Sequence, residues 1–140
     1  MSTAQKADQQ GLRSNYADQR VILIAEDDAI VANVARIALE KEGYFILTAR
    51  DGEEALSVSR EYSGPIHLVL SDIKMPKLDG LELRQQILTL RPEIKVLMMT
   101  GETEPVGKMP LLRKPFSPKE LRQTVRLMLE QDDEAQFSSV

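Results

Sequence analysis

The stretch VILIAEDD, residues 21–28, combines a short apolar run with a cluster of acids. Its apolar part, Val21–Ala25, is continuous rather than alternating, which is typical of a strand that is covered on both faces in a parallel sheet. The acids Glu26, Asp27 and Asp28 follow directly, where such a strand ends. If other strands also end in polar residues, their side chains meet these acids at one edge of the sheet.

Four further apolar runs follow, and helical patterns lie between them. The runs cover residues 44–47, 66–70, 94–99 and 111–112. Helices are expected from Ala29 to Glu42, which Gly43 terminates, from Asp51 to before Gly64-Pro65, around Leu83, Ile87 and Leu90, and from Ser117 onward. This alternation predicts an α/β fold, a doubly wound five-stranded parallel sheet.

The ends of the chain have a different composition. Residues 1–19 are rich in Gln, Ala, Ser and Asp, and residues 132–140 are mostly polar. Neither segment has an apolar period. We therefore predict a disordered leader or linker over 1–19, one domain over 20–131, and a disordered tail over 132–140. The last helix of the domain begins with a capping box, in which Ser117 and Glu120 flank Pro118 at the first helical position.

The overall composition excludes several classes of site. The net charge of −4, with no basic stripe, argues against nucleic-acid binding. The absence of cysteine excludes disulfides and thiolate metal sites. No apolar run approaches the ~18 residues of a membrane span, and residues 1–20 lack the apolar core of a signal peptide. These features predict no contact with a membrane and fit a cytoplasmic location.

The other strands do end in residues of complementary chemistry. Ser71-Asp72 follows the third run, Thr100-Gly101 the fourth, and Arg113-Lys114-Pro115 the fifth. Clustered carboxylates repel one another unless a cation is present, and Mg²⁺ suits a site with few carboxylates and a phosphate. Lysine supplies a point charge for a phosphoryl oxygen. A carboxylate can then act as a nucleophile toward phosphorus.

In these features the sequence resembles the response-regulator receiver domains of two-component signalling, including the receivers of hybrid sensor kinases. The matching pieces are Glu26-Asp27, Leu70–Pro76 with Asp79-Gly80, Met99-Thr100-Gly101 and Lys114-Pro115-Phe116. They occur in order, each at a strand end, and the match spans about residues 20 to 131. The resemblance implies a flavodoxin-like sheet with strand order 2-1-3-4-5.

The resemblance also implies roles for individual residues. Asp72 is expected to be the phosphoacceptor, with Glu26, Asp27, Asp72 and the backbone carbonyl of Lys74 holding Mg²⁺. Thr100 and Lys114 are expected to bind the phosphoryl group, and the Lys114–Pro115 peptide is expected to be cis. The implied donor is a phosphohistidine on a histidine kinase or phosphotransfer protein, with a downstream signalling protein as a second partner. Such a domain is a signalling switch that catalyses its own phosphoryl transfer and slow autodephosphorylation; whether it forms a homodimer stays open.

Two departures from the family concern its output. The segment 101–110 is short and holds two glycines and two prolines, so we predict that the usual fourth helix is absent or very short. Leu111 stands where many relatives carry a Tyr or Phe that rotates on activation. The phosphorylation chemistry is expected to survive, while its readout differs and favours a phosphorelay or stand-alone role.

Three other functions fit the sequence less well. An aspartate-nucleophile hydrolase generally carries an acid two residues after the nucleophile, where this chain has Lys74. A pseudo-receiver that only recruits partners fits poorly with a complete acid set. This chain lacks the phosphate-cradling loop of a flavin-binding module, because acids follow its first predicted strand instead. Asp28 is expected to be an N-cap rather than a ligand, His67 to lie away from the site, and Met98-Met99 to fill the core.

Overall fold

The computed structural model describes residues 19–101 and 108–138, with side chains as far as residue 131. Its elements are β1 (Val21–Ala25), α2 (Ala29–Glu40), β2 (Phe45–Ala49), α3 (Gly52–Glu61), β3 (Leu68–Asp72), α4 (Gly80–Leu90), β4 (Lys95–Thr100), β5 (Leu111–Arg113) and α5 (Pro118–Ser138). All strand pairs are parallel, and the order in the sheet is β2-β1-β3-β4-β5. The predicted doubly wound sheet and its strand order are confirmed.

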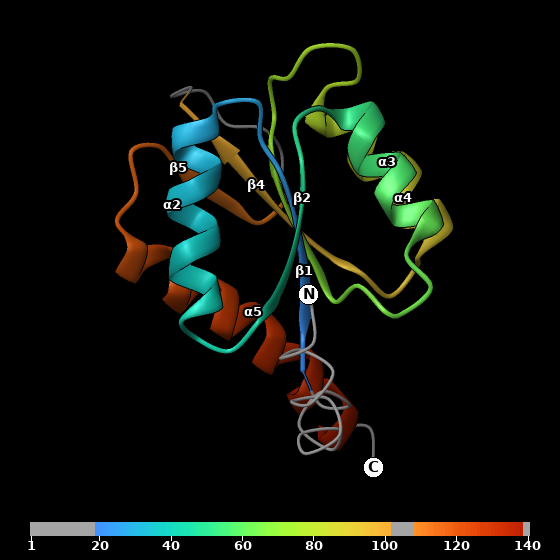
Figure 1. Cartoon of the computed structure of the whole chain (residues 1–140). Helices are drawn as coiled ribbons and strands as arrows, with labels where there is room; N and C mark the ends of the chain where they lie inside the picture. Colours follow the sequence, from blue (N-terminus) through green and yellow to red (C-terminus); the bar gives the residue numbers. More distant parts are fainter. Residues whose placement is uncertain (1–18, 102–107, 139–140) are drawn as a thin grey trace, which may run out of the picture.

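Helices cover both faces of the sheet, with α2 and α5 on one side and α3 and α4 on the other (Figure 1). Alternate residues of each strand enter different cores, so that Ile22 and Ile24 pack with the α2 and α5 side while Leu23 and Val69 pack with the α3 and α4 side. Because both faces are covered, the strands are apolar without alternation. Met98 and Met99 are fully buried, one in each core, as expected.

Each helix begins at a side chain that accepts backbone N–H groups. Asp28 accepts from Ile30 and Val31, which confirms it as the N-cap of α2. Asp51 and Asp79 cap α3 and α4 in the same way. At α5 the predicted capping box is present, since the Glu120 amide donates to Ser117 Oγ and the Ser117 amide donates to Glu120 Oε1. The caps therefore fix where each helix leaves the rim of the sheet.

The structure differs from the sequence expectations mainly at element ends. The third strand begins and ends two residues later than expected, so that Asp72 is its last residue. Helix α5 runs to Ser138, whereas 132–140 was predicted to be disordered. The segment after Gln131 holds Glu, Ala and Gln but no Gly or Pro, so nothing in it terminates a helix. The expectations for 1–18 and 139–140 lie outside the described residues.

Two further observations concern the segment before β5 and the membrane. Between β4 and β5, Gly101 and residues 108–110 are not helical, and residues 102–107 lie outside the described part of the chain. Across the described ranges, none of the helices combines the length and the apolar character needed to span a bilayer.

Candidate functional site

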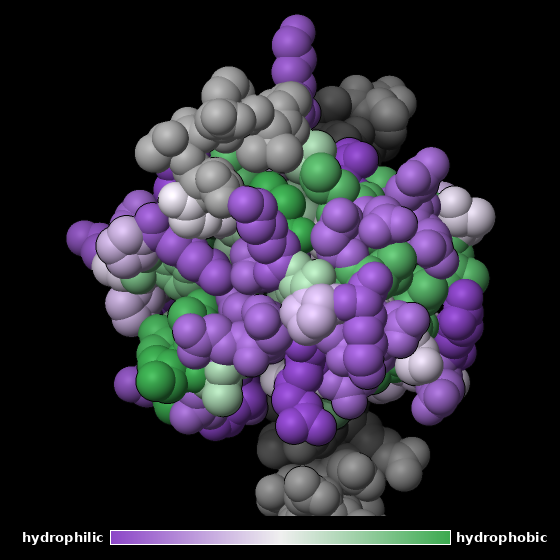
Figure 2. All heavy atoms as spheres, turned by 90° about the horizontal axis from the view of Figure 1, so that it is seen from above, coloured by the Kyte–Doolittle hydropathy of each residue, from purple (hydrophilic) through white to green (hydrophobic). Residues whose placement is uncertain are grey.

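The five parallel strands end at one rim of the sheet, and the predicted site residues lie there. Glu26 directly follows β1, and its amide donates to the carbonyl of Ala49 at the end of β2 (3.1 Å). Asp72 ends β3 and Thr100 ends β4. Lys114 follows β5, and its amide donates to the Thr100 carbonyl (2.7 Å). Figure 2 views this end of the molecule, where hydrophilic side chains cover the middle of the surface.

Three of the predicted ligands come together at this rim. Carboxylate oxygens of Glu26, Asp27 and Asp72 all lie within 4.8 Å of one another. Glu26 is buried, Asp72 is partly buried and Asp27 is exposed. Hard oxygen donors at this spacing, open to solvent on one side, fit Mg²⁺, which binds to few carboxylates and keeps several waters. The donor set therefore fits the metal that the sequence predicts.

The ammonium of Lys114 contacts two of these carboxylates. Its Nζ lies 2.8 Å from Glu26 Oε1 and 3.3 Å from Asp72 Oδ2. The second oxygen of Glu26 accepts the amide N–H of Asp28 at 3.0 Å. Glu26 is therefore held on both oxygens. Lys114, with 23% of its side chain exposed, lies at the solvent edge of the cluster.

Burial and neighbouring charge act against each other in this pair. Burial raises the pKa of the Glu26 carboxyl, and the hydrogen bonds from Lys114 and the Asp28 amide lower it only in part, while the charge of Asp72 raises it further. For Lys114, burial alone lowers the pKa, but the hydrogen bond and charge of Glu26, together with Asp72, outweigh it and raise the pKa. Lys114 stays protonated at neutral pH, and the acid cluster has an excess of negative charge that an added cation relieves.

Thr100 and Lys74 belong to the same rim as Asp72. Thr100 is buried at the end of β4, next to the strand that carries Asp72. Lys74 has an exposed side chain and lies two residues beyond Asp72, in the loop that leads to α4. The Lys114–Pro115 peptide is cis, as expected.

The loop after Asp72 is held by contacts that the sequence reasoning did not identify. The Ile73 amide donates to Met99, and the Gly80 amide donates back to the Ile73 carbonyl at 2.7 Å. A Cβ on Gly80 would lie 2.2 Å from the carbonyl oxygen of Asp72. Lys77 has a φ of 71° between Pro76 and Leu78, whose carbonyl and amide are joined by a 2.9 Å bond. The Asp79-Gly80 pair signals a turn, but not this close approach to the strand that carries Asp72.

His67 and Leu111 lie where the sequence reasoning placed them. His67 precedes β3 at the end of the sheet opposite to the acids, and its Nδ1 accepts the Val21 amide N–H. Leu111 begins β5 and is partly buried against the core on the α3 and α4 side.

Comparisons with known proteins agree with this geometry. The family model of the response regulator receiver domain matches residues 22–126. The sensor kinase CckA of Brucella abortus is 36% identical over 121 residues, covering 81% of this chain and 13% of that protein. The alkaline phosphatase synthesis transcriptional regulatory protein PhoP of Bacillus subtilis is 33% identical over 126 residues, covering 84% of this chain and 52% of PhoP. The chain thus spans about half of PhoP and a smaller part of CckA.

Solved structures give the same result. The receiver domain of the hybrid histidine kinase CckA has a TM-score of 0.71 and 35% identity, covering 78% of this chain and 98% of that domain. A CheY-like receiver domain protein from Methanospirillum hungatei JF-1 has a TM-score of 0.76 and 28% identity, covering 84% of this chain and 98% of that one. With the acids of β1 and β3 and the lysine after β5 on one rim, the chain belongs to the response regulator receiver domain family, a family of signalling domains.

Proposed function

We propose that this chain is a phosphoacceptor that takes a phosphoryl group onto Asp72 from a phosphohistidine of a histidine kinase or phosphotransfer protein. An Oδ atom of Asp72 attacks phosphorus, so that an O–P bond forms and the N–P bond of the donor breaks. The imidazole nitrogen leaves with the electron pair and takes up a proton from solvent. The observation that carries this proposal is the position of Lys114 Nζ, 3.3 Å from Asp72 Oδ2 beside the three clustered carboxylates.

Each residue of the rim has a separate task in this proposal. Glu26, Asp27, Asp72 and the carbonyl of Lys74 would hold Mg²⁺, which when bound supplies positive charge to offset the phosphoryl oxygens. Lys114 pairs with one phosphoryl oxygen, because its Nζ is already within reach of Asp72. The hydroxyl of Thr100 donates to another. Attack of a water molecule on phosphorus slowly breaks the new O–P bond and restores the Asp72 carboxylate.

The surface beside the rim supports a protein as the phosphoryl donor. Helix α2 begins one residue after Asp28 and carries Ile30, Val34 and Ile37 at i, i+4 and i+7. Their side chains are 76%, 42% and 43% exposed. Three apolar side chains on one helix face, next to the acids, form an apolar stripe that a facing helix of the donor can cover. The exchange would take place in the cytoplasm, where such donors act.

The signal leaves through a change at the rim rather than through DNA binding by this domain. Phosphorylation adds charge and acceptor oxygens at Asp72 and draws the buried Thr100 toward them. Because Thr100 ends β4, its movement is passed to the segment before β5. We propose that a downstream signalling protein reads this change, in the manner of a phosphorelay.

Intact-mass measurement tests the proposal. The wild-type chain is incubated with acetyl phosphate, with Mg²⁺ or with a chelator, and Asp72→Asn serves as the matched variant. We expect one phosphoryl group on the wild type with Mg²⁺ only, and none on Asp72→Asn. Equal labelling of the variant, or labelling that is independent of the metal, would contradict the proposal. Size-exclusion chromatography of the same samples with beryllofluoride distinguishes a monomer from a homodimer.

A further inference from the structure

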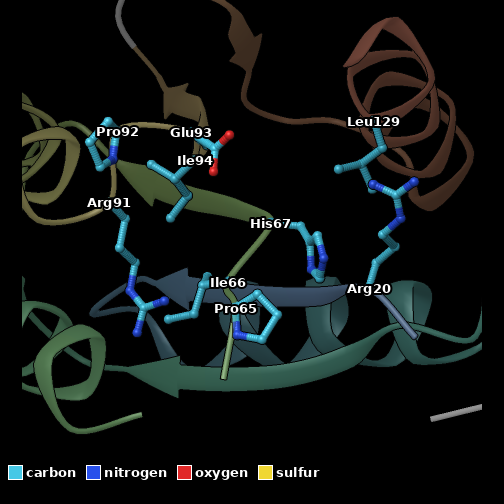
Figure 3. A pocket seen from close by; sticks show the side chains of 9 residues that line it. All are labelled: Arg20, Pro65, Ile66, His67, Arg91, Pro92, Glu93, Ile94 and Leu129. Atoms are coloured by element: carbon cyan, nitrogen blue, oxygen red, sulfur yellow. The ribbon is translucent and has the colours of Figure 1, made fainter. Parts of the chain in front are cut away.

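The end of the sheet opposite to the phosphoacceptor rim contains a pocket of about 390 Å³ (Figure 3). Its walls come from residues that precede β1, β3 and β4 and from α5. They include Arg20, Ile66, His67, Arg91, Glu93 and Leu129. His67 is the only histidine of the chain, and the proposed phosphoryl transfer makes no use of it.

His67 joins β1 to β3 through both its backbone and its ring. Its amide N–H donates to the Val21 carbonyl at 2.8 Å, and its carbonyl accepts the Lys95 amide at 3.1 Å. The ring adds a third bond, because the Val21 amide donates to His67 Nδ1 at 2.9 Å. Val21 is the first residue of β1 and is 5% exposed. The imidazole therefore satisfies a buried backbone donor at the start of the central strand.

This bond requires a neutral ring. A nitrogen that accepts an N–H carries no proton, so the proton of the neutral imidazole lies on Nε2. In the imidazolium both nitrogens are donors, and Nδ1–H would face the Val21 N–H. Turning the ring does not help, since neither nitrogen of the charged form accepts. Protonation of His67 therefore leaves the Val21 amide without this acceptor.

The charged groups around the ring also bear on its protonation. Arg20 and Arg91 line the pocket from opposite sides, and Glu93 lies at its edge (Figure 3). The guanidinium of Arg91 is bonded to the carbonyls of Ser59, Tyr62 and Gly64, so its charge stays fixed at the pocket wall. Helix α5 contributes the apolar Leu129 to the pocket wall. The guanidinium groups of Arg20 and Arg91 in the described pocket wall disfavour a further positive charge on the ring.

We propose that His67 is a proton-sensitive latch: its neutral ring fastens the start of β1 to β3, and proton uptake releases it. The direction in which stability changes with pH follows from the difference in proton binding between the folded and unfolded states. A histidine in an unfolded chain takes up its proton near pH ~6.5, whereas the latched form resists it. The unfolded state then binds more protons in mild acid, and stability is lost as the pH falls below that point. The latch lies far from Asp72 and acts in the metal-free protein.

Urea unfolding at pH 7.5 and pH 5.5, without Mg²⁺, tests the latch on the wild type, His67→Asn and His67→Gln. Asparagine places an uncharged acceptor where Nδ1 lies, so His67→Asn keeps the bond without the titration. Glutamine offers no acceptor at that position, so the His67→Gln variant is expected to be less stable than the wild type at both pH values. Relative to His67→Asn, we expect the unfolding constant of the wild type to increase about tenfold from pH 7.5 to pH 5.5, the limit for a group with an unfolded midpoint near 6.5.

The comparison with His67→Asn removes the contribution of all other titrating groups. A relative increase below twofold overturns the proposal, and a larger one supports it. Amide exchange of Val21 in the wild type gives a second readout that needs no variant. After correction for the intrinsic pH dependence of exchange, protection of this amide is expected to fall in acid, while Leu23 keeps its protection. Unchanged protection of Val21 would also overturn the latch.

Discussion

At the scale of single residues, the described site places the Lys114 ammonium against two of three clustered carboxylates. Lys114 contacts both Glu26 and Asp72, although it lies 88 residues from Glu26 in the sequence. Glu26 retains two hydrogen bonds, one from Lys114 and one from the Asp28 amide. The metal-free cluster is therefore ordered by a cation of the chain itself, which is well placed to turn to a phosphoryl oxygen on Asp72.

Replacing Lys114 by methionine tests this role. The Lys114→Met variant keeps the shape of the side chain but lacks the charge, so we expect labelling by acetyl phosphate to slow by about 100-fold, as when a charge-stabilising donor is removed from an active site. Mg²⁺ affinity should not fall, because no carboxylate is lost. Lys77→Met is the matched control, since Lys77 lies in the loop after Asp72, is 60% exposed and pairs with Asp51. Equal slowing in both variants would contradict the assignment.

Glu26 gives the site a pH dependence of defined sign. Because burial raises its pKa above 4.5, the folded, metal-free protein binds a proton more readily than the unfolded chain. The free energy of unfolding of the wild type, relative to Glu26→Gln, should therefore rise as the pH falls from the raised folded value toward 4.5. Urea titrations of both proteins without Mg²⁺ measure the difference. A relative fall in that window would contradict the burial argument.

At the scale of elements, the start of α4 is packed directly on the strand that carries Asp72. A Cβ on Gly80 would lie 2.2 Å from the Asp72 carbonyl oxygen and 2.9 Å from Ile73 Cα. Both are backbone atoms, so relief requires α4 or β3 to move. The position of Asp72 is thus coupled to the position of a helix that contributes none of the clustered carboxylates.

The Gly80→Ala variant measures this coupling. We expect a loss of about 3 kcal/mol or more in the free energy of unfolding, as for severe overpacking, and weaker labelling of the fraction that stays folded. Gly101→Ala is the control, because a Cβ there meets no atom within 4 Å although the residue follows Thr100 at the same rim. Urea unfolding of both variants measures the two losses in the free energy of unfolding. A loss below about 1 kcal/mol in Gly80→Ala would show that the helix moves freely.

The sequence predicts these elements well where local chemistry decides them. Caps at Asp28 and Ser117 are visible because a side chain bonds to a backbone group two or three residues away. The end of β3 is set instead by its neighbours, since Asp72 pairs in register with Met99 of β4. Likewise, the close approach at Gly80 depends on tertiary packing. Local patterns therefore predicted that the acids and Lys114 meet at one rim, but not the contacts that hold them there.

At the scale of the whole molecule, the two ends of the sheet differ in chemistry. The rim at the strand ends gathers the acids, whereas the opposite end gathers Arg20, His67 and Arg91 around a pocket. From the sequence, we predict that the short segment 101–110 and Leu111 give this chain a readout that differs from that of many relatives. The exposed stripe of α2 lies beside the acid rim and is the surface on which we place the phosphoryl donor.

The apolar stripe of α2 is tested by comparing labelling by a small phosphoryl donor with transfer from a protein donor. Ile30→Gln should leave labelling by acetyl phosphate unchanged, since a small donor needs no protein surface. Transfer from a phosphorylated histidine phosphotransfer domain that labels the wild type should slow by about tenfold or more, as for an interface anchor. Leu127→Gln on α5 is the control, because Leu127 is 60% exposed but lies on another helix. Equal effects of both substitutions on transfer would place the donor elsewhere.

The most direct test of the account is a crystal structure of the chain with Mg²⁺ and beryllofluoride, which imitates a bound phosphoryl group. The account predicts beryllium on an Oδ atom of Asp72, with Lys114 Nζ and the Thr100 hydroxyl on its fluorides and the metal against Asp27. Beryllofluoride on any other carboxylate, or a site in which Lys114 stays paired with Glu26 alone, would contradict it.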